Sequence, residues 1–143
     1  MESSFDLKNS FKFNISTYYE DTDSSGYVYH TSYLRFAERA RSEMLKKISP
    51  RIFKSLVKGD FLFVIKDLKI DYFKPCQLFD DLQIKSNIIG HSKCSLLINQ
   101  EVFKNSETCV QIKVKLVWIN ILSGRPVKMP SYLISRFNSF KIV

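Results

Sequence analysis

The spacing of hydrophobic positions divides the chain into an early strand, a long helix and a series of later strands. Apolar and polar residues alternate over 11–19, which predicts a strand because successive side chains of a strand point to opposite faces. From 31 or 32 to about 49 the period becomes that of a helix, with Thr31 or Ser32 as its N-cap, and Pro50 ends it. The predicted apolar stripe of this helix is formed by Leu34, Ala37, Ala40, Met44, Leu45 and Ile48.

The second half of the chain has the composition and alternation of strands, with a short helix at each end. The short helices are predicted over 51–58 and 131–138. The predicted strands cover 61–73, 82–89, 94–103 and 108–121. Consecutive strands with short connections favour antiparallel pairing, and one long helix must cover one face of the sheet. The pattern alone therefore predicts an α+β fold, in a single domain over residues 1–143.

Composition supports one hydrophobic core and leaves the meaning of the charge open. The chain is 45% hydrophobic, with 12 Phe and 7 Tyr, enough for one core at this length. Its formal net charge of +8 is compatible with nucleic acid, an anionic membrane or a phosphorylated ligand such as coenzyme A. The lysines are scattered without a dense cluster, which favours a solvated basic surface. No nucleic-acid-binding motif is present, so we predict no nucleic-acid partner.

The start of the chain and its cysteines give no sign of export, disulfides or metal. The first ten residues lack the basic and apolar regions of a signal peptide, and no apolar run is long enough to span a bilayer, so we expect a cytoplasmic protein. Cys76, Cys94 and Cys109 are widely spaced, as expected of buried small hydrophobes. His30 and His91 do not define a metal site, and none is predicted.

The residues that suggest chemistry lie at 18–33, YYEDTDSSGYVYHTSY. Carboxylates there precede a helix start, where free backbone N–H groups and the helix dipole favour negative charge. A charged oxygen beside N–H donors suits acyl transfer, because the donors can hold a developing oxyanion. From the residues alone, Asp23 is more readily explained as a cap or turn former, and His30 as an ordinary cap or interface residue.

The same segment, continued to residue 45, resembles the start of the Tol–Pal-associated acyl-CoA thioesterases of the YbgC type. These belong with the 4-hydroxybenzoyl-CoA thioesterases in the hotdog superfamily. The pattern Y-x-D-T-D-x-x-G-x-V-Y-H followed by Y-L-x-F-x-E-x-A-R is matched almost throughout. The weaker blocks LFVIKDLKIDYFKPCQLFDDL and WINILSGRPVKMP extend the resemblance over 11–130. Ser24, Ser25 and Tyr27 depart from the usual family residues, which could alter the preferred acyl-chain length.

The resemblance implies a fold, an activity and an assembly. The fold is a curved antiparallel sheet of five to six strands wrapped around one long helix. The activity is hydrolysis of an acyl-CoA to free acid and coenzyme A, without metal or cofactor. Asp23 corresponds to the catalytic carboxylate, acting as nucleophile or general base. A backbone N–H near His30 polarises the thioester carbonyl, and the His30 ring helps to orient the site. The assembly is a homodimer or homotetramer with active sites at the subunit interface.

Substrate contacts are less well defined by the sequence. Tyr29, next to His30, is a candidate substrate contact, although packing with one polar tip explains it equally. Lys66, Lys93 and Arg125 are candidates for binding the phosphates of coenzyme A, because they lie at predicted strand ends or turns. Surface lysine is abundant in this chain, so a solvated surface role stays open for them.

Two rival functions also remain open at this stage. Hotdog proteins include dehydratases and hydratases that act on acyl carriers, and product analysis separates double-bond formation from thiol release. Alternatively, the protein binds acyl carrier protein or partners of membrane biogenesis with weak or no hydrolysis, since acyl carrier proteins are acidic. Activity that does not depend on Asp23, together with salt-sensitive binding, would favour this second rival.

Overall fold

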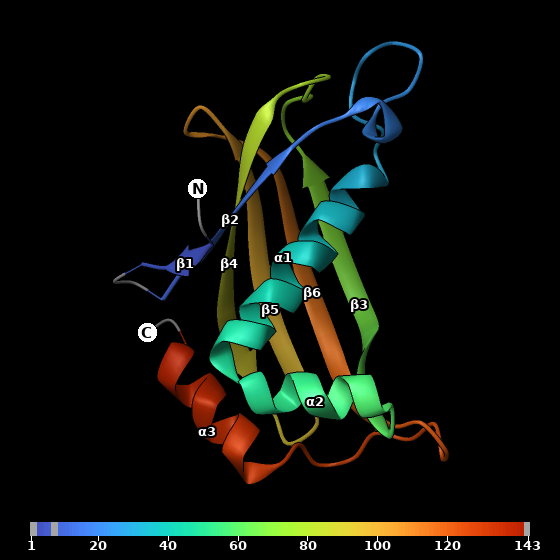
Figure 1. Ribbon diagram of the computed structural model, residues 1–143, viewed down its shortest axis with the longest axis vertical. Coiled ribbons are helices and arrows are strands. Elements are labelled where there is room, and N and C mark those ends of the chain that lie inside the picture. Colours follow the sequence, from blue (N-terminus) through green and yellow to red (C-terminus); the bar gives the residue numbers. More distant parts are fainter. Residues whose placement is uncertain (1–2, 7–8, 142–143) are drawn as a thin grey trace.

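The computed structural model describes residues 3–6 and 9–141, and a six-stranded antiparallel sheet forms its centre (Figure 1). The strands are β1 (Ser4–Phe5), β2 (Phe11–Ser16), β3 (Phe61–Tyr72), β4 (Asp81–His91), β5 (Ser95–Lys104) and β6 (Glu107–Asn120). The helices are α1 (Ser32–Ile48), α2 (Pro50–Lys58) and α3 (Ser131–Phe140). The strand order β1-β2-β4-β5-β6-β3 places β3 at one edge, and α1 lies across one face of the sheet. The α+β prediction is therefore confirmed.

The predicted boundaries agree with the structure to within a few residues, with two omissions. The predicted strand over 11–19 ends early, because Tyr19–Asp21 forms a 3-10 turn, η1, that was not predicted. The two-residue strand β1 was also missed, since it is too short to show alternation. The predicted domain includes residues 1–2, 7–8 and 142–143, which lie outside the described part. Among the described residues, no helix is both long enough and apolar enough to cross a membrane.

The helix α1 packs closely on the sheet through its two alanines. Ala37 and Ala40 have no exposed surface, so the helix backbone approaches the strands without a bulky side chain between them. The buried face is rotated relative to the predicted stripe. Tyr33 and Phe36 are buried, whereas Leu34 is only partly covered. The reason is that the strands beneath the helix set its tilt on the sheet, and this tilt decides which side chains face inward.

A buried polar cluster joins α1 to the middle of the sheet. Arg41 is 6% exposed and donates from Nη1 to Gln100 Oε1 on β5, at 2.9 Å. The Gln100 amide nitrogen donates to the carbonyl of Ala37 and to the hydroxyl of Ser86, both at 2.9 Å. Burial lowers the pKa of Arg41, and no carboxylate within the described residues forms an ion pair with it. Gln100 is thus the main neutral partner of a desolvated cation.

We expect Gln100→Leu to lower the free energy of unfolding by about 2–4 kcal/mol, because it leaves the Arg41 guanidinium buried without its acceptor. Urea unfolding followed by circular dichroism measures this change. The matched control is Asn99→Ala on the same strand, where the side chain is half-buried and bonds only neighbouring polar side chains. Equal losses in the two variants would mean that the Arg41–Gln100 bond contributes no more than an ordinary strand contact.

Candidate functional site

The loop between β2 and α1 folds back on itself as a short hairpin. A backbone bridge joins Thr22 to Val28, and the amide of Asp23 donates to the carbonyl of Tyr27 at 3.1 Å. Gly26 closes the hairpin with a φ of 84°, a left-handed conformation that glycine adopts without strain. The loop therefore presents its carboxylates from a defined backbone.

Asp21 fixes this hairpin to the start of α1. Its carboxylate is buried, accepts from the amide of Tyr18 at 2.8 Å and forms an ion pair with Arg35 at 3.4 Å. Its carbonyl accepts from the amide of Tyr29 at 2.8 Å and from the hydroxyl of Ser32 at 3.0 Å. These bonds give Asp21 a structural role.

Asp23 is exposed at the tip of the hairpin. The Ser25 hydroxyl donates to Asp23 Oδ1, and the Ser25 amide donates to the same oxygen at 2.8 Å. These two bonds, with the hydroxyl contributing most, hold the pKa of Asp23 below its ordinary value. The carboxylate is therefore ionised at neutral pH and open to solvent. The Asp23 side chain thus accepts hydrogen bonds from Ser25 in its own turn, whereas the Asp21 carboxylate forms an ion pair with Arg35 in the first turn of α1.

The backbone at His30 offers free hydrogen-bond donors. Within the described residues, the amide N–H groups of His30 and Thr31 donate no hydrogen bond. Thr31 is the N-cap residue of α1, one of the two positions predicted, but its side chain makes no capping hydrogen bond, and the helix begins at Ser32. The His30 ring lies against the Tyr29 ring at 4.3 Å between centroids, and the His30 carbonyl accepts from the Tyr72 hydroxyl at 2.9 Å. Two unused N–H groups thus lie on a fixed backbone at the positive end of a helix.

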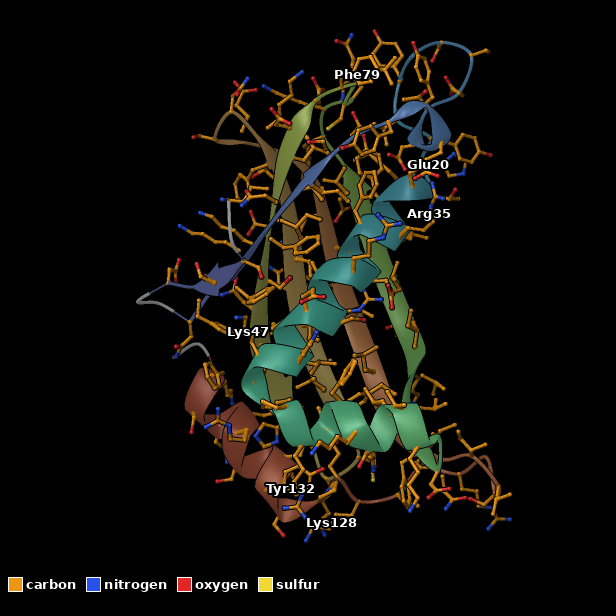
Figure 2. The ribbon with its side chains drawn as sticks, in the orientation of Figure 1. Glu20, Arg35, Lys47, Phe79, Lys128 and Tyr132 are labelled. Atoms are coloured by element: carbon orange, nitrogen blue, oxygen red, sulfur yellow. The ribbon has the colours of Figure 1, made fainter. Side chains whose placement is uncertain are left out.

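Exposed aromatic side chains gather at the same end of the molecule. Figure 2 shows Glu20, Arg35 and Phe79 at this end, and the Tyr19 and Phe79 rings lie 5.5 Å apart. The exposed aromatic residues from the hairpin and from the end of β3 onward are Tyr18, Tyr19, Tyr27, Tyr29, Tyr72, Phe73 and Phe79. Such an apolar surface is typical of a binding or subunit contact. Sequence reasoning missed Tyr72, Phe73 and Phe79, whose only signal was their position at a strand end and beside Pro75.

Two hollows lie near the hairpin, and Asp23 lines neither. One, of about 760 Å³, runs along β2 and includes Glu20, Asp21 and Arg39. The other, of about 490 Å³, lies between α1 and β3 and is lined by Leu34, Arg35, Glu38, Arg39, Arg41 and Ile65. The second hollow opens at the free edge of the sheet, where Ile65 is 51% exposed.

The three candidate phosphate contacts do not lie beside Asp23 within one chain. Lys93 is in the turn between β4 and β5, where its carbonyl accepts from Met129 at 2.8 Å. Arg125 is in the turn after β6, at the end of the sheet where β3 begins. Lys66 is the bulged residue midway along β3, so the prediction that it lies at a strand end or turn is wrong. Since β3 has 12 residues and spans about 40 Å at roughly 3.3 Å per residue, Lys93 and Arg125 lie at the opposite end from the hairpin.

The possible metal ligands and thiols form no convergent site. Within residues 3–6 and 9–141, no three His, Cys, Asp or Glu side chains lie close enough to hold a metal ion. His91 bonds Asn138 through Nε2 at 2.7 Å. All three cysteines are free thiols; Cys76 and Cys109 are buried, as predicted, and Cys94 is partly exposed.

Comparison with known proteins identifies the family. Residues 19–137 match the Thioesterase-like superfamily. The acyl-CoA thioesterase YbgC of Haemophilus influenzae is 33% identical over 135 residues, which cover 94% of this chain and 99% of that protein. A probable thioesterase from Bartonella henselae is 32% identical with a TM-score of 0.76, covering 85% of this chain and 99% of that one.

A thioesterase from Thermus thermophilus, solved with coenzyme A and zinc, is 26% identical and superposes with a TM-score of 0.79. The superposition covers 93% of this chain and 94% of that one. These relatives confirm the predicted hotdog thioesterase fold, with its long helix against an antiparallel sheet. The match to the superfamily and the identity with YbgC both extend over most of the chain. This protein therefore belongs to the YbgC family of thioesterases.

Proposed function

We propose that the protein hydrolyses acyl-CoA thioesters to a free acid and coenzyme A, with Asp23 supplying the reactive oxygen. The observation that carries this proposal is an ionised, solvent-open carboxylate on the same loop, between β2 and α1, as the two unused backbone N–H groups of His30 and Thr31. The curated YbgC relatives are named for acyl-CoA thioester hydrolysis, which supports the choice of substrate class.

The arrangement supports two routes for the carboxylate. As a nucleophile, an Asp23 oxygen attacks the thioester carbon, the thiolate of coenzyme A leaves and takes up a proton, and water then hydrolyses the mixed anhydride. As a general base, Asp23 takes a proton from water while the water oxygen attacks the same carbon, and the tetrahedral intermediate then expels the thiolate of coenzyme A, which takes up that proton. In both routes the carbonyl oxygen gains negative charge, which the His30 amide N–H is suited to stabilise. No step in either route calls on a cofactor.

The edge strand β3 supports a dimer as the working unit. Among residues 3–6 and 9–141 no strand pairs with its outer edge, and an unpaired edge of 12 residues readily pairs with another strand. Pairing β3 with β3 of a second copy would also wall the hollow beside Ile65.

Such a pairing would bring Lys93 and Arg125 toward the hairpin of the partner subunit. Because two copies of one edge strand related by a two-fold axis run antiparallel, the end of one chain that carries Lys93 and Arg125 lies toward the hairpin end of its partner. These residues then become candidates for the phosphates of a substrate held at the partner's Asp23. Tyr29 and Lys66 remain candidate contacts nearer the shared edge. Cytoplasmic location and acyl carrier protein as a further partner stay predictions.

We expect Asp23→Asn to lower thiol release from acyl-CoA esters by about a hundredfold or more, because the amide keeps the shape but lacks the charged oxygen. A panel of acyl chain lengths, followed with a thiol reagent, measures this loss and defines the preferred chain. The control is Glu20→Gln, an exposed carboxylate on the same loop, which should retain native rates. Equal rates in the native and Asp23→Asn proteins would remove Asp23 from the mechanism. Double-bond formation without thiol release would favour the dehydratase instead.

The pH dependence of kcat/KM tests the link between Ser25 and Asp23. The Ser25 bonds stabilise the ionised carboxylate, so removing the hydroxyl in Ser25→Ala raises the pKa of Asp23 toward its ordinary value. We expect the acidic limb of the profile, where activity is lost by protonation, to move to higher pH. Ser24→Ala, which removes a neighbouring hydroxyl that does not bond Asp23, is the control. An unchanged acidic limb in Ser25→Ala would show that another group sets it.

Light scattering tests the proposed assembly. We expect the native protein to have at least twice the 16.8 kDa mass of one chain. Ile65→Asp places like charges close together at the paired edges, so the mass should fall and thiol release should fall with it. Ile89→Asp is the control, because Ile89 is 41% exposed on β4, which two strands separate from β3. A native protein that is monomeric and fully active would exclude an interface site.

A further inference from the structure

The region around α2 combines cations with exposed apolar side chains. Five cations and one carboxylate occupy residues 46–60, which gives this segment a net charge of +4, half of the chain's +8. The cations are Lys46, Lys47, Arg51, Lys54 and Lys58, and the carboxylate is Asp60. Of these cations only Lys58 forms an ion pair within the described residues, with Asp60 at 3.3 Å. The positive charge is thus concentrated and largely uncompensated by protein carboxylates.

The cations surround an apolar face that α2 leaves uncovered. Phe53 and Val57, four residues apart on one face of the helix, are 46% and 73% exposed. Lys46 extends from α1 over the Phe53 ring, with its Nζ 5.1 Å from the centroid. Between the two helices a shallow cleft of about 220 Å³ is lined mainly by Leu45, Phe53, Leu56 and Val57. Ile52, which is fully buried, packs the inner face of α2 into the core, so the core does not depend on Phe53 and Val57.

The opposite end of the molecule has a different charge pattern. There the cations Arg35, Lys74 and Lys104 each pair with a carboxylate, at Asp21, Glu107 and Asp80. Figure 2 shows Lys47, Lys128 and Tyr132 on the half of the molecule that holds α2 and α3, away from Glu20 and Phe79. Arg39 and Lys85, which line the hollow near the hairpin, form no ion pair among the described residues, but four unpaired cations within 46–58 make the α2 region the denser group.

We propose that the α1–α2 patch, formed by Phe53 and Val57 with Lys46, Lys47, Lys54 and Lys58, docks the protein on an anionic phospholipid surface. A basic helix with an apolar face lies at a membrane interface, with its apolar side chains below the headgroups and its cations among the phosphates. An acidic protein partner fits less well, because guanidinium forks bind carboxylates best and the patch contains only lysines. The arginine of this segment, Arg51, instead covers the Tyr132 ring at 4.2 Å.

The patch also suits the assembly proposed above. An antiparallel pair of β3 strands in one continuous sheet is related by a two-fold axis perpendicular to that sheet. Both copies of α1 and α2 then lie on the same side, so two patches face one membrane together and their contributions reinforce each other. The docking proposal stands without this dimer, which would only strengthen the binding.

Flotation with vesicles tests the proposal on the full-length protein. We expect binding to vesicles of phosphatidylglycerol and phosphatidylcholine, and much weaker binding to phosphatidylcholine alone. Lys54→Glu with Lys58→Glu should lower the partition coefficient by at least about 25-fold, at roughly fivefold for each lysine lost. Phe53→Ser with Val57→Ser should lower it about tenfold without any change in charge. The charge-matched control, Lys12→Glu with Lys113→Glu on the other face of the sheet, should lower it less than the patch variant.

Fluorescence reports whether the apolar face enters the lipid. Phe53→Trp should show a blue-shifted emission with anionic vesicles and quenching by brominated lipid, while Trp118, only 2% exposed, serves as the internal reference. Thiol release from a short acyl-CoA in solution checks that the variants are folded. If the charge-reversed patch variant and the charge-reversed control lose vesicle binding equally, net charge alone explains the binding and the proposal is overturned. Absence of vesicle binding, or salt-sensitive binding to acyl carrier protein that needs the same residues, would also overturn it.

Discussion

The close packing of α1 on the sheet is the constraint on which the other features depend. Ala37 and Ala40 bring the helix backbone down to the strands, and the Arg41–Gln100 bond fixes its position along β5. Because Asp21 binds Ser32 and Arg35 in the first turn of α1, the helix determines where the site hairpin lies. A larger residue at either alanine would lift the helix and move the candidate catalytic loop with it.

The same packing leaves part of the sheet uncovered. One helix is too narrow to cover six strands, so the face near β3 remains open beside Ile65. Apolar residues on that open strand are costly in a monomer but useful at an interface. This open face next to a closed hydrophobic core is the reason that the proposed site includes a second copy of the chain.

Much of the fold could be predicted from the sequence, because its long elements have strong periodicity. The strand that became β6 showed five alternating apolar residues, and Pro50 marked the break between two helices. What could not be predicted depended on contacts distant in sequence. The helical spacing puts Arg41 on the apolar stripe, four residues after Ala37 and three before Met44, and puts the exposed Arg39 on the opposite face. The sequence does not show that the acceptor for the buried guanidinium is Gln100, 59 residues away. The prediction for Leu34 failed for a similar reason, since the tilt of a helix on a sheet is set by the strands beneath it.

In the candidate site, too, features set by neighbouring residues could be predicted, and features set by contacts distant in sequence could not. The turn at Asp23 and the start of α1 follow from neighbouring residues, and the motif located them correctly. Lys93 and Arg125 were also placed in turns as predicted, but the end of the sheet at which a turn lies depends on the strand order β4-β5-β6-β3. That order separates them from Asp23 by the length of β3 within one chain. An antiparallel partner is the arrangement that reverses this separation, so any contribution of these cations to catalysis is a property of the assembly rather than of the single chain.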